Sequence, residues 1–177
     1  MFPENGIEPD ELTVVSVLKA CTHKKDIDPG RLVHCYVIKR SFSFDIFVGN
    51  SLIDMYLKCL YATSAFEGFY EMPQKNAVSW NSILSGFVHN ECLYVVSAEL
   101  KRCKWAHGLA IRSGLTTEVA VGTASLDMYS KYGKINLSRR MFDQIPERNI
   151  VSWSATIDSY GMDSRAKDAM ARVLECL

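Results

Sequence analysis

Apolar residues recur at helical spacing along most of the chain. Val14, Val17, Leu18 and Cys21 fall at positions i, i+3, i+4 and i+7, which places them on one face of a helix, and Thr13 is a candidate N-cap. The same kind of spacing predicts further helices within residues 32–37, 50–58, 64–72, 79–88, 94–113, 123–131, 137–145, 153–160 and 164–177.

Residues that interrupt helices separate these segments. Asp28-Pro29-Gly30, Pro73 and Gly114 each predict a turn or the end of a helix, and residues 94–113 fit either one long helix or two helices joined near Cys103. No Asn-Gly or Asp-Gly turn joins strand-like alternating segments. The pattern therefore predicts an all-α fold, an α-solenoid of stacked helix–turn–helix repeats with the first helices on one face and the second helices on the other.

A long block of the chain is written twice, and the second copy follows the first at a fixed offset of 73 positions. The residues of the first copy that recur are His34, Ile38, Val48, Gly49, Asp54, Met55, Tyr56, Lys58, Phe69, Pro73, Asn76, Val78, Ser79 and Trp80. A constant offset over such a length is typical of stacked-repeat proteins, which carry their function along one continuous face rather than in a single pocket.

Most of the recurring residues fit a structural role. Tyr56, Trp80 and their copies lie among apolar residues at helical spacing, so we interpret them as core. His34 and His107 have no recurring carboxylate or cysteine beside them, which favours a contact between neighbouring helices over a metal or catalytic site.

Composition narrows the classes of function. The chain is 48% hydrophobic and 23% charged, and its twenty basic residues balance its twenty acidic ones, so RNA binding would need a local stripe or contacts to bases. The six cysteines lack zinc-ligand spacing and are interpreted as reduced thiols. No apolar run is long enough to cross a bilayer, which gives no indication of a membrane partner.

Three stretches of the chain resemble the plant pentatricopeptide-repeat (PPR) proteins. They are Asn50-Ser-Leu-Ile-Asp-Met-Tyr-Leu-Lys-Cys59, Phe69-Tyr-Glu-Met-Pro-Gln-Lys-Asn76 and Val78-Ser-Trp-Asn-Ser-Ile83. The chain is most similar to the PLS subclass, in which repeats of about 35, 35 and 31 residues alternate. The N-terminus has the features of neither a signal peptide nor a transit peptide, so we expect the chain to begin inside a larger architecture.

The resemblance divides residues 1–177 into the repeats of a single solenoid. The expected boundaries are a repeat tail at 1–10, an L repeat at 11–45, an S repeat at 46–76, an irregular unit at 77–118, a second S repeat at 119–149 and an incomplete P repeat at 150–177. The irregular unit opens like a P repeat and closes like an L repeat. It has 42 residues where two full repeats would need about 70, which indicates an internal deletion that fused the two.

In this family each repeat contacts one base, through its fifth and its last residue, while its second residue wedges beside the base. The base-reading positions implied here are Asn50, Asn76, Asn81, Thr123, Asn149 and Ser154, and the wedging positions are Phe47, Val78, Ala120 and Val151. Short amide and hydroxyl groups suit the hydrogen bonds of a base edge. Taken alone, Asn50 and Asn81 would more often be N-caps or surface amides.

The identity of each pair implies a base preference. By resemblance, Asn50 with Asn76 reads a pyrimidine and favours cytosine, and Thr123 with Asn149 reads adenine. The remaining positions imply a weak pyrimidine preference for Asn81 with Glu118, a purine preference for Ser154, and no reading for Val15 with Asp45.

The chain carries no recognisable catalytic constellation. A cytidine-deaminase tail would need H-x-E and C-x-x-C, and a phosphate-binding loop would be glycine-rich; we find neither, and expect a binding module without cofactor or small-molecule substrate. The resemblance implies single-stranded RNA of a mitochondrion or chloroplast as the ligand, with editing partner proteins supplying catalysis in trans. A tetratricopeptide-like protein-interaction scaffold and a degenerate fragment with little activity of its own remain alternatives.

Overall fold

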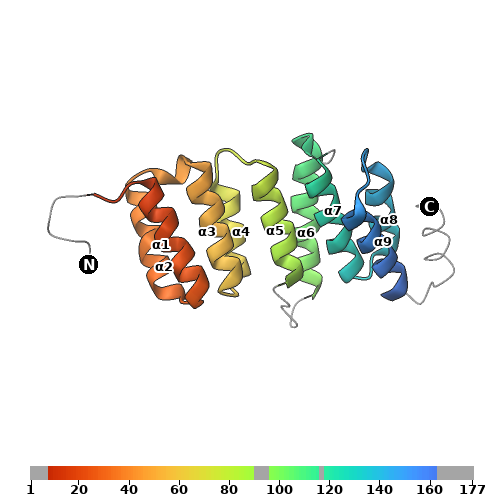
Figure 1. Ribbon diagram of the computed structural model, residues 1–177, viewed down its shortest axis with the longest axis horizontal. Helices are drawn as coiled ribbons and strands as arrows, with labels where there is room; N and C mark the ends of the chain where they lie inside the picture. Colours follow the sequence, from red (N-terminus) through yellow and green to blue (C-terminus); the bar gives the residue numbers. More distant parts are fainter. Residues whose placement is uncertain (1–7, 90–95, 116–117, 163–177) are drawn as a thin grey trace. The chain divides into compact units, whose positions relative to one another are not determined.

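The computed structural model describes residues 8–89, 96–115 and 118–162 (Figure 1). These residues form α-helices joined by short turns and one 3₁₀ helix, and they contain no strand. The chain divides into two compact units, Met1–Ile83 and Leu84–Leu177. Within each unit helices stack as helix–turn–helix repeats, so the predicted all-α class of stacked helical repeats is confirmed.

The first unit is built from two helical hairpins and the beginning of a third. Its helices are α1 (Glu11–Lys24), α2 (Ile27–Lys39), α3 (Ile46–Lys58), α4 (Ala62–Glu71) and the first half of α5 (Ala77–His89), with a 3₁₀ helix, η1 (Phe42–Phe44), before α3. Helix α1 packs against α2 and α3, and α3 packs against α4. Because α1 packs against α3, the first helices of the two successive hairpins lie side by side.

The second unit repeats this arrangement. It contains the rest of α5, then α6 (Val96–Arg112), α7 (Val119–Lys131), α8 (Ile135–Gln144) and α9 (Ile150–Met162). Helix α7 packs against α6, α8 and α9, and α8 also packs against α9. Among the described helices of both units, none is long and apolar enough to cross a bilayer.

Two of the predicted helix boundaries are wrong. Asp10, not Thr13, is the N-cap of α1, and its Oδ1 accepts a hydrogen bond from the Thr13 backbone N at 2.8 Å. Asp28-Pro29-Gly30 does not break the chain, because Pro29 lies in the first turn of α2, where a missing N–H costs no helical hydrogen bond. The break lies earlier, at Lys25, whose φ of 53° is left-handed.

The other boundaries differ mainly at helix N-termini. The helices predicted to start at 50, 79, 123 and 153 start two to four positions earlier. Their first turns mix buried and exposed apolar residues, such as Val48 and Phe47, so they show no one-sided periodicity. Gly114, with a φ of 70°, follows the end of α6 as predicted, whereas the helix predicted at 164–177 lies outside the described residues.

The two copies of the repeated block pack their cores in the same way. The Phe69 and Trp80 rings meet edge to face with centroids 4.7 Å apart, and Phe142 and Trp153 do so at the same distance. Of these, Trp153 is only half-buried, while the other three are buried or belong to the core. This edge-to-face pair joins the second helix of one repeat to the first helix of the next.

A second recurring contact is a hydrogen bond between a histidine and a tyrosine. His34 Nδ1 lies 2.8 Å from Tyr56 Oη, joining α2 to α3, and His107 Nδ1 lies 2.9 Å from Tyr129 Oη, joining α6 to α7. Burial lowers the pKa of both histidines, although Glu71 acts in the opposite sense on His34, and burial raises the pKa of Tyr129 to about 12. The predicted structural role of both histidines is confirmed.

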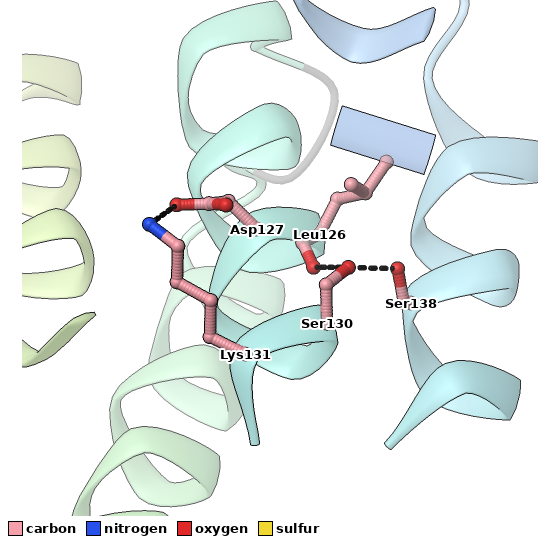
Figure 2. Close-up of polar contacts among 5 residues, drawn as sticks. All are labelled: Leu126, Asp127, Ser130, Lys131 and Ser138. Carbon is pink, nitrogen blue, oxygen red and sulfur yellow. Dashed lines mark hydrogen bonds and ion pairs between the residues drawn. The ribbon is translucent and has the colours of Figure 1, made fainter. Parts of the chain in front are cut away.

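The copies differ at several buried positions, and two of these form a pair of serines in the second copy. Leu57 and Ala65 of the first copy are replaced by Ser130 and Ser138, both buried. Ser130 Oγ donates to the Leu126 carbonyl oxygen at 2.9 Å and lies 2.7 Å from Ser138 Oγ (Figure 2). Because the single Ser130 proton goes to the carbonyl, Ser138 is the donor to Ser130. The two hydroxyls thus form a hydrogen bond with each other at positions where the first unit has apolar side chains.

This serine pair predicts a non-additive loss of stability. Ser130→Ala leaves the Ser138 hydroxyl buried without its acceptor and should cost about 1–3 kcal/mol, whereas Ser138→Ala leaves Ser130 bonded to Leu126 and should cost about 1 kcal/mol. The double variant should lose less than the sum of the two. Urea unfolding followed by circular dichroism measures all three, and additive losses would contradict the pairing.

The histidine pairs predict a stability that falls with acidity. Their folded pKa values lie below the unfolded value of about 6.5, so the unfolded chain binds more protons as the pH drops through that value. The unfolding free energy should fall by on the order of 1 kcal/mol between about pH 7.5 and 5.5. A His34→Gln/His107→Gln variant, which does not titrate there, should show a flatter profile; an unchanged slope would contradict this assignment.

Candidate nucleic-acid interface

The predicted reading positions occupy two recurring places in the fold. Asn50 and Thr123 lie in the second turns of α3 and α7, on the first helix of their repeats. Asn76 and Asn149 directly precede α5 and α9. In the first unit the two places meet, because Asn50 Nδ2 donates to Asn76 Oδ1 at 3.4 Å.

The last residue of each of these repeats caps the helix that follows it. Asn76 Oδ1 accepts from the Ser79 backbone N at 3.0 Å, while the Asn76 backbone N donates to Ser79 Oγ at 3.2 Å. Asn149 and Ser152 exchange the same two hydrogen bonds, at 2.9 and 3.0 Å. This reciprocal pattern is a capping box with serine at the third helical position. The cap takes the amide oxygen and leaves the Nδ2 group for other partners.

The other last positions differ in how they cap. Asp45 accepts from the backbone N of Phe47 and of Val48, so its carboxylate is held by α3. Its partner position, Val15, is half-buried and has no hydrogen-bonding group. Glu118 is the N-cap of α7 but makes no side-chain cap hydrogen bond. Asp45 and Glu118 therefore present different chemistry from the two asparagines.

Ser79 joins the cap to the predicted reading position, although the sequence marked it only as a recurring residue of the repeated block. Its Oγ donates to Asn50 Oδ1 at 2.6 Å. In the second unit Ser152 Oγ instead donates to the Asn149 carbonyl oxygen at 2.9 Å, and Thr123 Oγ1 is buried without a partner among the described residues. The available signal was the Asn-x-x-Ser spacing within the repeated block, which is typical of an N-terminal cap.

Each predicted wedging residue lies three positions before a predicted reading residue, which places the two on one helix face. The pairs are Phe47 with Asn50, Val78 with Asn81, Ala120 with Thr123, and Val151 with Ser154. All four wedging side chains are exposed, and Phe47 is 72% exposed. An exposed phenyl ring beside an amide pair offers stacking area next to hydrogen-bonding groups.

The remaining two reading positions are accessible in part. Asn81 is half-buried in α5, and Ser154 is exposed in α9. Asn81 belongs to the first compact unit, whereas Glu118, its predicted partner, belongs to the second. Among the predicted reading sites, the one at Asn50 therefore has both of its predicted residues in contact with each other.

Lys75, which directly precedes Asn76, is bound by backbone groups of the protein itself. Lys75 Nζ donates to the Tyr70 and Met72 carbonyl oxygens and lies 5.2 Å from the Phe69 ring centroid. Burial lowers the pKa of Lys75. Arg148 occupies the equivalent place in the second copy, with its guanidinium 4.8 Å from the Phe142 ring centroid. Lys75 and Arg148 thus donate to carbonyl oxygens at the ends of α4 and α8.

Comparison with known proteins identifies similar sequences. Residues 50–76 match the family model of the PPR repeat. Similar proteins from Arabidopsis thaliana include two pentatricopeptide repeat-containing proteins named as chloroplastic. One is 32% identical over 94% of this chain and 24% of its own length, and the other is 33% identical over 91% of this chain and 35% of its own length.

A pentatricopeptide repeat-containing protein of the same plant, named as mitochondrial, is 30% identical over 97% of this chain and 29% of its own length. The chain therefore spans about a quarter to a third of the length of these relatives. The likeness extends over nearly all of the chain, and the residues that match the family model include both Asn50 and Asn76. The chain belongs to the pentatricopeptide-repeat family.

Proposed function

We propose that this chain binds single-stranded RNA, with one repeat placed against each base. The observation that carries the proposal is the cluster of Asn50, Asn76 and Ser79 beside the exposed ring of Phe47. A base stacked on the ring would present its edge to the amides. The edge must be free of a pairing partner, which favours single strands over duplexes.

The proposed base preferences follow the side-chain pairs. Asn50 with Asn76 would favour cytosine, and Thr123 with Asn149 would favour adenine. The Thr123 hydroxyl is buried, so it would have to turn outward to reach a base. Threonine in a helix populates two χ1 rotamers, which makes such a rotation accessible. We assign the weaker preferences, pyrimidine at Asn81 and purine at Ser154, to the flanking repeats.

We also propose the repeat boundaries given by the PLS pattern, with an S repeat at 46–76 and another at 119–149. Their ends coincide with the capping asparagines, so each proposed repeat closes where the next helix begins. The irregular unit at 77–118 contains the division between the two compact units.

The proposed setting is organellar RNA editing or processing. Relatives named as chloroplastic and mitochondrial support an organelle as the location. The proposed role is recognition, with partner proteins supplying catalysis in trans. In this setting the chain determines which RNA sequence is bound, and the partner proteins supply the reaction.

Binding to short RNAs tests the proposal. In fluorescence anisotropy titrations, oligonucleotides with a pyrimidine-pyrimidine core followed one or two positions later by adenine should bind more tightly than purine-swapped controls. Asn50→Asp places a carboxylate at the site and removes an amide donor, which should weaken binding by about tenfold. Asn136→Asp, the same change at an exposed position of α8, is the matched control and should bind as the unmodified chain does.

Equal affinity for all sequences, or equal losses in the two variants, would contradict base reading at Asn50. Binding of a peptide at the same face without any RNA binding would instead favour the protein-interaction alternative.

A further inference from the structure

The Ser79 hydroxyl has two roles at once. It accepts a hydrogen bond from the Asn76 backbone N, which completes the cap of α5, and it donates to Asn50 Oδ1. A hydroxyl has one proton, and the 2.6 Å distance to Asn50 Oδ1 is shorter than the 3.0 Å distance to Asn76 Oδ1. The proton therefore goes to Asn50.

The resulting hydrogen bonds form a closed circuit. The Asn76 backbone N donates to Ser79 Oγ, which donates to Asn50 Oδ1; Asn50 Nδ2 donates to Asn76 Oδ1, which also accepts from the Ser79 backbone N. Every donor in the circuit has an acceptor. Turning the Asn50 amide over would place its Nδ2 group against the Ser79 hydroxyl and its oxygen against Asn76 Oδ1, with two acceptors facing each other.

The fixed orientation determines what the site offers to a base. One N–H of Asn50 and both N–H groups of Asn76 are unused by the circuit, whereas both lone pairs of Asn76 Oδ1 are occupied. The site is therefore rich in donors. The ring nitrogen N3 of cytosine is an acceptor, and the same atom of uracil carries a hydrogen. An N–H of the site placed against N3 therefore finds an acceptor in cytosine and a hydrogen in uracil.

The second copy separates this bridge from the cap. Ser152 caps α9 as Ser79 caps α5, but its hydroxyl donates to the Asn149 carbonyl oxygen and makes no hydrogen bond to Thr123 among the described residues. The cap thus forms without a bridge to the reading position. The bridge in the first copy depends on the asparagine at position 50.

We propose that Ser79 is a positioning residue that fixes the Asn50 amide and thereby sets the discrimination between cytosine and uracil at this repeat. The proposal rests on RNA binding as proposed above and assigns a specific role to a residue of the following repeat. Without the hydroxyl, the Asn50 oxygen loses its donor and only the 3.4 Å hydrogen bond to Asn76 Oδ1 holds the amide. The side chain can then rotate out of the circuit and offer its oxygen to the N3–H of uracil. Loss of Ser79 should then relax selectivity more than affinity.

Two RNAs that differ only by cytosine or uracil at the base facing Asn50 test this proposal. We expect the unmodified chain to favour cytosine by about tenfold, and Ser79→Ala to reduce that ratio to about twofold. Ser152→Ala removes the equivalent cap and should leave the ratio unchanged. An unchanged ratio in Ser79→Ala, or an equal fall in Ser152→Ala, would overturn the positioning role.

A measurement on the free protein keeps this outcome separate from the proposed function. Nitrogen-15 relaxation of the Asn50 side-chain amide should report a rigid group in the unmodified chain and a mobile one in Ser79→Ala, with helical content unchanged. Equal mobility in both would overturn the orienting role whether or not RNA binds. A rigid amide in a chain that binds neither RNA would overturn the proposed function and, with it, the selectivity assigned to Ser79.

Discussion

The capping box that begins α5, and again α9, is the constraint on which the rest of the site depends. Asn76 with Ser79, and Asn149 with Ser152, end the turn between repeats and begin the next helix. Such a cap contributes about 1 kcal/mol to the helix that it starts. It also fixes the side chains of Asn76 and Asn149, because the backbone uses their amide oxygens. A local folding signal thereby positions the proposed recognition group at no separate cost in side-chain ordering.

Burial made the helices predictable, and capping decided where they begin. The 3.6-residue spacing of Leu52, Ile53 and Tyr56 follows from packing against neighbouring helices, so sequence alone located the core of α3. The first turn of the same helix carries the exposed Phe47, which has no periodic signature. Likewise Pro29 suggested a break because prolines usually interrupt helices, although its place in the first turn is permitted.

The candidate site was predictable in its positions but not in its contacts. Family resemblance located Asn50 and Asn76, since the motif has fixed spacing, but the bridge through Ser79 depends on a hydroxyl rotation that no sequence pattern encodes. The second copy makes the point directly, since the same serine at Ser152 turns toward a carbonyl oxygen when threonine replaces asparagine. Similarly, Ser130 and Ser138 replace an apolar pair without altering the packing of α7 against α8.

A nuclear magnetic resonance titration of the side-chain amides tests the central claim most directly, which is that Asn50 and Asn76 form one base-binding site. On addition of a short cytidine-containing RNA, the side-chain amide signals of both residues should shift together and give the same dissociation constant, while the Asn136 signal on α8 should stay in place. Shifts at Asn136 with none at Asn50 and Asn76, or different dissociation constants for these two, would contradict the account.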